Sequence, residues 1–188
     1  MFLQNKPAIL LLAFSAFIIL LMQSSLACAH IEKGQMPDPL AIMEYRILLE
    51  FEPDNLEVRN MLGMALYRQE KLDEAEQEFN YVLTIDPQNF NAIDALGLIK
   101  MKQGKLDHAV DLFKKAIYIN PDDLLVHYHL GQALELLGDA DSAARAYRSA
   151  LDKKPSGDQD EWYLEQQQQL IEALKNIEGN QKETSVSR

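Results

Sequence analysis

Cysteine is almost absent from this sequence, and its absence removes several structural options. The single cysteine, Cys28, lies near the N-terminus, so no disulfide can form within the chain. A domain of roughly 150 residues does not need one, because it is long enough to bury a hydrophobic core. A cysteine-based metal site is not predicted either, because it needs several thiolates or imidazoles at short spacings.

Sequence motifs for catalysis are also missing. There is no Gly-rich phosphate loop, no Gly-x-Ser-x-Gly and no Cys/His cluster. His127 and His129 are two residues apart, and on a helix such residues point about 200° away from each other, so they cannot grip one metal ion. Asp73 and Glu74 stand at an expected helix start, where unpaired backbone N–H groups stabilise carboxylates. We predict that the protein is not an enzyme and uses no cofactor and no metal.

Basic residues are outnumbered by acidic ones. The chain has 18 lysines and arginines against 29 aspartates and glutamates, for a formal net charge of -11. Nucleic acids and anionic lipid surfaces both require a basic face on the protein that binds them. The charge balance therefore argues against both of these partners.

What the sequence does contain is one pattern written three times. Pro53, Pro87, Pro121 and Pro155 stand 34 residues apart, and self-similarity at such a fixed period is the signature of repeat architectures. Between the prolines, similar residues return at the same spacings. The first copy has Arg59, Leu62, Gly63, Leu66, Ala75, Phe79 and Val82; the second has Ile93, Leu96, Gly97, Lys100, Ala109, Phe113 and Ala116; the third has His127, Leu130, Gly131, Leu134, Ala143, Tyr147 and Ala150.

Each copy has the periodicity of two helices. Apolar residues recur three or four positions apart in two runs, which is the spacing of one face of an α-helix. Asp86 and Asn120 end the second helix, because each precedes a proline and is pushed out of helical geometry. One glycine per copy falls within the first helix, where it costs roughly 1 kcal/mol relative to alanine. We expect these glycines to face an alanine of the second helix and to let the two backbones approach closely. The expected pairs are Gly63 with Ala75, Gly97 with Ala109 and Gly131 with Ala143.

This pattern resembles the tetratricopeptide repeat family over 100 residues, 56–155, without an insertion. It departs from the family pattern only at the large residue before Leu-Gly and at the aromatic residue three positions after Gly. The resemblance implies an all-α solenoid of antiparallel helix pairs, with repeats at 56–89, 90–123 and 124–157. Each repeat leaves one apolar face that the next repeat covers.

Partial elements flank the three repeats. Residues 40–55 repeat only the second half of the pattern, with a helix from Leu40 to Phe51, and we interpret them as a half-repeat that covers the first full repeat. Residues 158–178 are predicted to form a capping helix with Asp158 or Asp160 as its N-cap. Residues 179–188 are predicted to be a disordered tail. The apolar stripe of the capping helix is expected to consist of Trp162, Tyr163, Leu170, Leu174 and Ile177.

The first 29 residues differ in composition from the rest. Residues 1–6 carry one positive charge, and residues 7–22 are almost wholly apolar and uncharged, which predicts an export or membrane signal. Three alternatives are open: a signal peptide cleaved before His30, a lipid anchor on Cys28 at a sequence that loosely resembles a bacterial lipobox, or a retained membrane anchor. All three place the rest of the chain in the periplasm or envelope, behind a polar linker at residues 30–39.

The family resemblance also implies a binding surface. In this family the first helices of successive repeats line a concave groove that holds an extended peptide or a partner helix. In place of the Lys, Asn and Arg with which carboxylate-clamp members grip an acidic C-terminus, this chain has Asp94, Gln132 and Glu135. The implied floor of Met, Leu and Tyr suits an apolar peptide or helix. Carried over position by position, the groove residues are Asn60, Met64, Tyr67, Arg68, Asp94, Leu98, Met101, Lys102, Leu125, Tyr128, Gln132 and Glu135.

Two functions from different classes follow from these features. The first is an exported, membrane-tethered scaffold that binds a partner polypeptide and supports assembly of an envelope complex such as a pilus or secretion apparatus. Its architecture is similar to that of exported repeat lipoproteins in such systems. The second is a structural repeat protein that self-assembles into a homo-oligomer or coat. A monomer that retains a specific peptide favours the first function, and an oligomer that persists at dilution favours the second.

Overall fold

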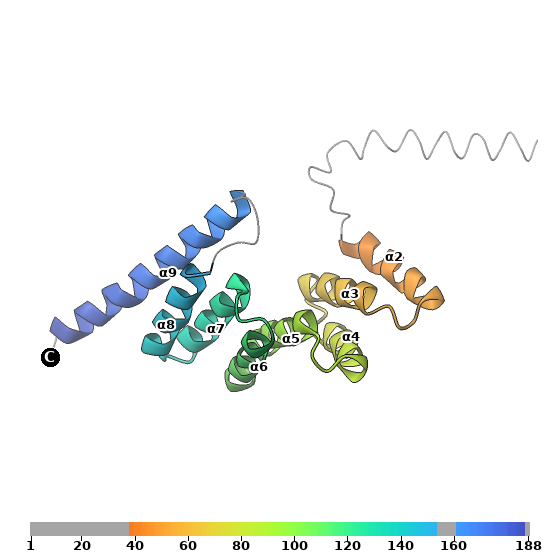
Figure 1. The fold of residues 1–188 in the computed structure, drawn as a ribbon, viewed down its shortest axis with the longest axis horizontal. Helices are drawn as coiled ribbons and strands as arrows, with labels where there is room; N and C mark the ends of the chain where they lie inside the picture. The colour runs from red at the N-terminus through yellow and green to blue at the C-terminus, as the bar shows by residue number, and fades with distance from the viewer. Residues whose placement is uncertain (1–37, 154–160, 187–188) are drawn as a thin grey trace, which may run out of the picture.

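The computed structural model describes residues 38–153 and 161–186 (Figure 1). Within these ranges every regular element is an α-helix, which confirms the predicted all-α class. The helices are α2 (Asp38–Phe51), α3 (Leu56–Arg68), α4 (Leu72–Ile85), α5 (Phe90–Lys102), α6 (Leu106–Ile119), α7 (Leu124–Leu136), α8 (Ala140–Leu151) and α9 (Glu161–Val186).

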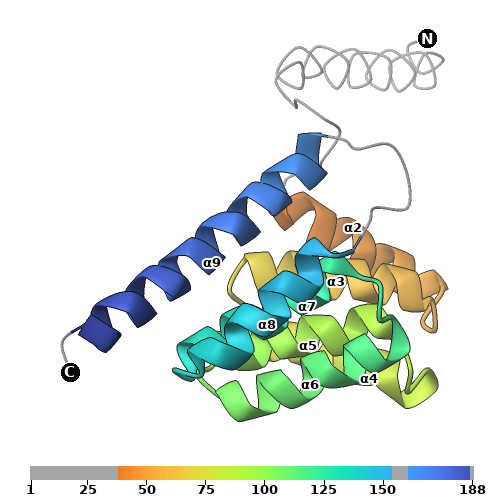
Figure 2. The ribbon, with the colours of Figure 1, turned by 60° about the vertical axis from the view of Figure 1, so that its left-hand side comes forward.

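The helices form a row in which each packs mainly on its neighbours in sequence. α3 with α4, α5 with α6 and α7 with α8 are helix pairs joined by short turns (Figures 1 and 2). Beyond successive helices, α3 contacts α5 and α5 contacts α7, so the first helices of the three pairs form one continuous layer. Such a row of repeated pairs is a solenoid, as the period predicts.

The same kind of cap begins the first helix of every pair. The side chains of Asn55, Asn89 and Asp123 each accept a hydrogen bond from the backbone N–H three residues on, at 3.1, 3.1 and 3.0 Å. Each cap lies two residues after a proline that follows the preceding helix. The proline prevents the earlier helix from continuing, and the cap satisfies a backbone donor of the next one.

The turn inside each pair requires a left-handed backbone. Glu70, Gly104 and Gly138 occupy the same position of the three repeats, and their φ angles are 59°, 72° and 82°. Glycine adopts this conformation without steric cost, whereas a residue with a Cβ atom costs roughly 1–2 kcal/mol there. Two of the three turns therefore use glycine for a conformational reason.

We expect Gly104→Ala to lower the free energy of unfolding by about 1 kcal/mol, because the left-handed φ disfavours alanine. A Cβ atom at this position would meet no atom within 4 Å, so the cost is one of backbone conformation and not of packing. Urea denaturation measures the change. Gly179→Ala is the matched control, because Gly179 is helical and its Cβ would also meet nothing within 4 Å. Equal losses in both variants would contradict the assignment.

The three mid-helix glycines make room for an aromatic ring. A Cβ atom added to any of them would lie less than 3.0 Å from ring atoms of the second helix. The nearest neighbour is thus the aromatic residue four positions beyond the alanine, which the expected pairing with Ala75, Ala109 and Ala143 did not include. The observed pairs are Gly63 with Phe79, Gly97 with Phe113 and Gly131 with Tyr147.

Three residues before the Leu-Gly pair of the first and third repeats, a polar side chain forms a hydrogen bond with the backbone of the preceding proline. Arg59 Nε donates to the carbonyl oxygen of Pro53 at 2.8 Å, and His127 Nε2 lies 2.9 Å from the carbonyl oxygen of Pro121. Ile93, at the same position of the second repeat, is fully buried instead. His127 is therefore a hydrogen-bonded histidine at a packing position, as the sequence predicts.

The first described helix closes one end of the row. α2 begins at Asp38, two residues before the predicted start, because Pro39 is tolerated in the first turn of a helix. Ala41 and Ile42 are buried, and α2 packs on α3. Among the described residues, several apolar side chains of α2 stay exposed, and Phe51 at its end is 80% exposed.

The last helix closes the other end and is longer than expected. Leu170, Leu174 and Ile177 are buried in a cluster with side chains of α8, as the predicted stripe requires. α9 continues to Val186, so the expected disordered tail is wrong for residues 179–186. Gly179 costs a helix only about 1 kcal/mol, and no proline follows it to break the backbone hydrogen bonds.

Several predicted features lie outside the described residues. They comprise the leader at residues 1–29, Cys28, the linker up to residue 37, the N-cap candidates Asp158 and Asp160, and the side chains of Trp162 and Tyr163. In the described ranges, 38–153 and 161–186, no helix combines the length and apolar character that crossing a bilayer requires.

Candidate partner-binding surface

The predicted groove residues lie on α3, α5 and α7, and all of them keep some contact with solvent. The structure divides them among two pockets and the surface between. Asn60, Met64, Arg68 and Asp94 line a pocket near α2, which we call the N-terminal pocket. Eight of the twelve predicted residues thus line hollows on this layer of helices. Met101, Tyr128, Gln132 and Glu135 line a second pocket near α9, which we call the C-terminal pocket.

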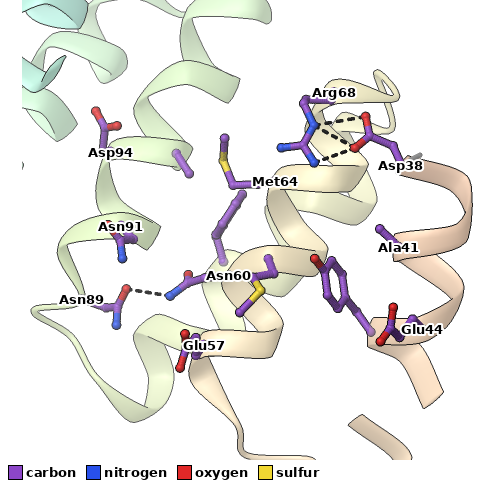
Figure 3. A pocket seen from close by; sticks show the side chains of 14 residues that line it. Asp38, Ala41, Glu44, Glu57, Asn60, Met64, Arg68, Asn89, Asn91 and Asp94 are labelled. Atoms are coloured by element: carbon purple, nitrogen blue, oxygen red, sulfur yellow. Dashed lines mark hydrogen bonds and ion pairs between the residues drawn. The ribbon is translucent and has the colours of Figure 1, made fainter. Parts of the chain in front are cut away.

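The N-terminal pocket has a volume of about 920 Å³ and lies where α2, α3 and α5 meet (Figure 3). Its wall on one side is α2, which sequence reasoning placed in the cover of the first repeat and not in the groove. Apart from the four predicted residues, the lining is Asp38, Ala41, Glu44, Tyr45, Glu57, Met61, Phe79, Asn89, Asn91 and Ala95.

An ion pair bridges α2 and α3 at the rim of this pocket. Arg68 Nη2 donates to Asp38 Oδ1 at 2.6 Å, and Arg68 Nε donates to both carboxylate oxygens at 2.9 and 3.1 Å (Figure 3). This hydrogen-bonded contact lowers the pKa of Asp38 and raises the pKa of Arg68. The guanidinium of Arg68, predicted to contact a partner, is therefore already engaged within the chain.

The other acidic groups of the N-terminal pocket are less engaged. Asp94 Oδ1 lies 2.9 Å from Nδ1 of His129. Within the described residues, Glu44 and Glu57 have no ion-pair partner. Figure 3 shows their carboxylates beside the cavity, one from α2 and the other from α3.

An asparagine at the floor of the N-terminal pocket has an unsatisfied oxygen. Asn60 Nδ2 donates to Asn89 Oδ1 at 3.1 Å (Figure 3), and the same oxygen of Asn89 caps α5. Asn60 Oδ1 is buried and, within the described residues, accepts no hydrogen bond. A buried acceptor without a donor costs roughly 1–3 kcal/mol.

The C-terminal pocket has a volume of about 540 Å³ and is closed on one side by α9. Tyr147 Oη donates to Glu135 Oε2 at 2.8 Å, and Gln132 Nε2 donates to Tyr128 Oη at 2.9 Å. Burial, followed by the contact with Glu135, raises the pKa of Tyr147 well above its usual range. Burial also raises the pKa of Tyr128. Both phenols are therefore neutral hydrogen-bonding groups. The residues that α9 contributes are Gln169, Glu172, Ala173 and Asn176.

Four predicted groove residues, Tyr67, Leu98, Lys102 and Leu125, line neither pocket. Lys102 Nζ lies 5.0 Å from the ring centroid of Tyr67 and donates to Glu70 at 2.8 Å. This hydrogen bond raises the pKa of Lys102. Leu98 packs against the central apolar cluster. These contacts belong to the joints between repeats.

His127 and His129 have separate hydrogen-bond partners. His127 bonds to Pro121, and His129 bonds to Asp94 and packs 5.6 Å from the ring of Phe113. Among the described residues, no three His, Cys, Asp or Glu side chains are placed to hold one metal ion. His127 and His129 thus each have a hydrogen-bond partner outside their own helix.

Sequence reasoning missed the contributions of both end helices. Asp38 and Glu44 come from α2, and Glu172 comes from α9; the groove implied by the repeats draws only on their first helices and so contains neither end helix. A signal did exist for Glu57, which occupies the first turn of α3 one residue after its start. Acidic residues in a first turn are usually explained by the helix dipole alone.

Family models describe the same repeats. A model described as TPR repeat matches residues 97–138, and two models described as Tetratricopeptide repeat match residues 39–90 and 126–156. Together the three matches span more than half of the chain. A comparison with curated proteins found no match.

Solved structures with the same fold include secretion chaperones. The type III secretion translocator chaperone SycD of Yersinia enterocolitica is 17% identical, with a TM-score of 0.62 over 69% of this chain and 88% of that chain. SycD in complex with a peptide of the translocator YopD is 17% identical, with a TM-score of 0.61 over 68% of this chain and 95% of that chain. MamA is 19% identical, with a TM-score of 0.55 over 77% of this chain and 88% of that chain.

Proposed function

The chain belongs to the tetratricopeptide repeat family, and we propose that it is a non-catalytic scaffold that binds a partner polypeptide along the layer of α3, α5 and α7. The observation that carries this proposal is the pair of open pockets, of about 920 and 540 Å³, on that layer. Both are lined by apolar and polar side chains together, which suits recognition of a peptide or helix. The structure of SycD with a YopD peptide supports peptide binding by this fold.

We also propose that residues 1–29 bring the scaffold to the cell envelope. The apolar run at residues 7–22 supports export, with Cys28 as the anchoring residue if the segment is lipidated. A membrane tether would hold the binding layer next to an assembling envelope complex. The fold shared with secretion chaperones supports a pilus or secretion apparatus as that complex.

Photo-crosslinking in the host cell tests the scaffold function. We expect benzoylphenylalanine in place of Met61 to capture one foreign polypeptide, because Met61 lines the N-terminal pocket and is 38% exposed. The same group in place of Tyr118, which is 87% exposed and lines neither pocket, is expected to capture none. Mass spectrometry identifies the product. An identical mixture from both positions would contradict binding in the pocket.

A second candidate function is self-assembly, and the free face of α2 favours it. Met43 and Ile47 are 57% and 49% exposed, although the same positions of the second repeat hold Asp111 and Lys115. An apolar stripe at the end of a solenoid is a surface on which another copy can stack. Sedimentation at increasing dilution separates the two functions. A scaffold is monomeric without its partner, whereas a self-assembling protein keeps its oligomer.

A further inference from the structure

The hydrogen-bonding groups left free in the N-terminal pocket are mostly acceptors. Glu44 and Glu57 have no cationic partner within the described residues, and Asn60 Oδ1 accepts no hydrogen bond. Asp94 has one oxygen directed to His129, which leaves its second oxygen available. A ligand that fits this pocket must therefore bring donors.

The described lining of the N-terminal pocket supplies no free cation. Arg68 is the only lysine, arginine or histidine among its lining residues, and Asp38 takes three of its hydrogen bonds. Because the opposite charges of Arg68 and Asp38 cancel, the remaining charges of the lining are the carboxylates of Glu44, Glu57 and Asp94. An anionic ligand would meet three like charges and no counter-charge.

Apolar side chains accompany these carboxylates. Met61 and Met64 line the same cavity from α3, and Tyr45 lines it from α2. Methionine adapts its shape to different apolar partners. A bare cation would leave this part of the surface uncovered, so the lining favours a ligand in which a cationic group adjoins an apolar one.

We propose that the N-terminal pocket receives a lysine or arginine of the partner polypeptide together with a neighbouring apolar side chain. This inference rests on the proposed scaffold function and specifies the chemistry of the partner. The charged group lies between Glu44 and Glu57 on one side and Asp94 on the other, and its stem packs on the methionines. A turn of the Asn60 amide toward the cavity exchanges its hydrogen bond with Asn89 for one between Oδ1 and a donor of the ligand.

The size of the N-terminal pocket and the net charge of the chain both agree with a basic partner. The volume of about 920 Å³ exceeds what one side chain needs, so a lysine or arginine and its neighbour both fit. The formal net charge of -11 steers basic polypeptides toward the protein at low ionic strength. The C-terminal pocket differs, because its lining has two carboxylates, Glu135 and Glu172, and Glu135 already accepts a hydrogen bond from Tyr147.

Fluorescence anisotropy with three matched peptides tests the proposal on the full-length chain. The probe is a peptide of two Leu-Lys-Lys-Leu-Leu-Lys-Leu heptads, and in the other two peptides glutamine or glutamate replaces every lysine. We expect the lysine peptide to bind about tenfold more tightly than the glutamine peptide, and the glutamate peptide not to bind. Raising the salt concentration is expected to weaken binding of the lysine peptide most, because salt screens the ion pairs.

Charge-neutral variants assign the binding to this pocket. The double variant Glu44→Gln, Glu57→Gln is expected to bind the lysine peptide about tenfold more weakly. Its affinity for the glutamine peptide is expected to stay unchanged. The matched control is Glu50→Gln with Asp111→Asn, which removes the same charge from exposed positions that line neither pocket. It is expected to change the affinity less than twofold.

The outcomes separate this inference from the scaffold function. Equal losses in the two double variants would overturn the inference, because binding would then follow the net charge and not the pocket. Equal affinity for the lysine and glutamine peptides would overturn it as well. The scaffold function survives either result, because the crosslinks formed from Met61 and Tyr118 in the cell test it separately.

Discussion

The Leu96→Asp variant is expected to lack the folded array under conditions where the unchanged protein is stable. Leu96 is 4% exposed and belongs to the cluster that joins α3, α4 and α5. Removing a buried leucine costs about 2–5 kcal/mol, and burying an unpaired carboxylate adds several more. This sum is comparable with the 5–15 kcal/mol that typically stabilises a whole domain.

Because Leu96 lies in the central repeat, its replacement is expected to unfold the whole array. Repeats of a solenoid contact only their neighbours, so disruption of the central pair α5 and α6 also removes its interfaces with α4 and α7. Unfolding of the second repeat therefore leaves two short pieces, each too small to bury a core of its own.

Far-ultraviolet circular dichroism at 25 °C measures this loss. Leu40→Asp is the matched control, because Leu40 is 52% exposed and lies in the first turn of α2, where a carboxylate is favourable. We expect the control to keep its helical signal and its melting temperature within a few degrees. Full helicity in Leu96→Asp would show that the apolar clusters are not what holds the repeats together.

The helices could be predicted from the sequence because their boundaries are set locally. A proline ends one helix, and an asparagine or aspartate two residues later caps the next, as at Pro87 and Asn89. These signals return in every copy, so three weak indications reinforce one another. The aromatic neighbour of each mid-helix glycine was not predicted, because Ala75 and Phe79 lie on the same helix face and spacing alone does not tell which side chain comes nearest to Gly63.

The candidate site was predictable in its helices but not in its shape. Asn60 and Asp94 follow from the repeat pattern, because each sits at a set position of a first helix. The wall formed by α2 does not, since Asp38 precedes the repeats and its contact with Arg68 depends on how α2 crosses α3. The wall formed by α9 follows the last repeat and has no period to place it. Carrying over the family's groove positions therefore names candidate residues, but it does not tell which of their charged groups already form ion pairs within the chain.

The Arg68–Asp38 ion pair shows why the pairing of charges within the chain matters for function. A groove read from the repeats alone contains Arg68 and Lys102 as cations and so appears neutral on balance. In the structure Arg68 is bound to Asp38 and Lys102 to Glu70. The carboxylates of Glu44, Glu57 and Asp94 then dominate the N-terminal pocket, and the expected ligand changes from an apolar segment to one that is both apolar and basic.

The effect of Gly97→Ala is expected to change sign when Phe113 is shortened. In the unchanged protein, a Cβ atom on Gly97 would lie within 3.0 Å of the Phe113 ring, which is fully buried and cannot swing away. Overpacking of this kind costs about 1–3 kcal/mol, which exceeds the roughly 1 kcal/mol that alanine contributes to a helix. Gly97→Ala alone therefore destabilises.

Phe113→Ala by itself is expected to cost about 3–5 kcal/mol, because it removes a ring that is 0% exposed and leaves a cavity beside Gly97. In that background the methyl group of Gly97→Ala enters vacated space and keeps its helical advantage. The second substitution should then raise the free energy of unfolding by about 1 kcal/mol. If Phe113→Ala is too unstable to fold, Phe113→Leu provides a milder background with the same expected sign.

Urea denaturation of the four proteins gives the coupling free energy between the two positions directly. Gly179→Ala, added to the same two backgrounds, should have the same effect in both, because Gly179 lies on α9 and a Cβ there would meet no atom within 4 Å. If Gly97→Ala stabilised both backgrounds, the ring of Phe113 would not be the reason for glycine in the first helix. A sign change at Gly97 alone would establish that each repeat keeps its glycine to admit the aromatic ring of its second helix.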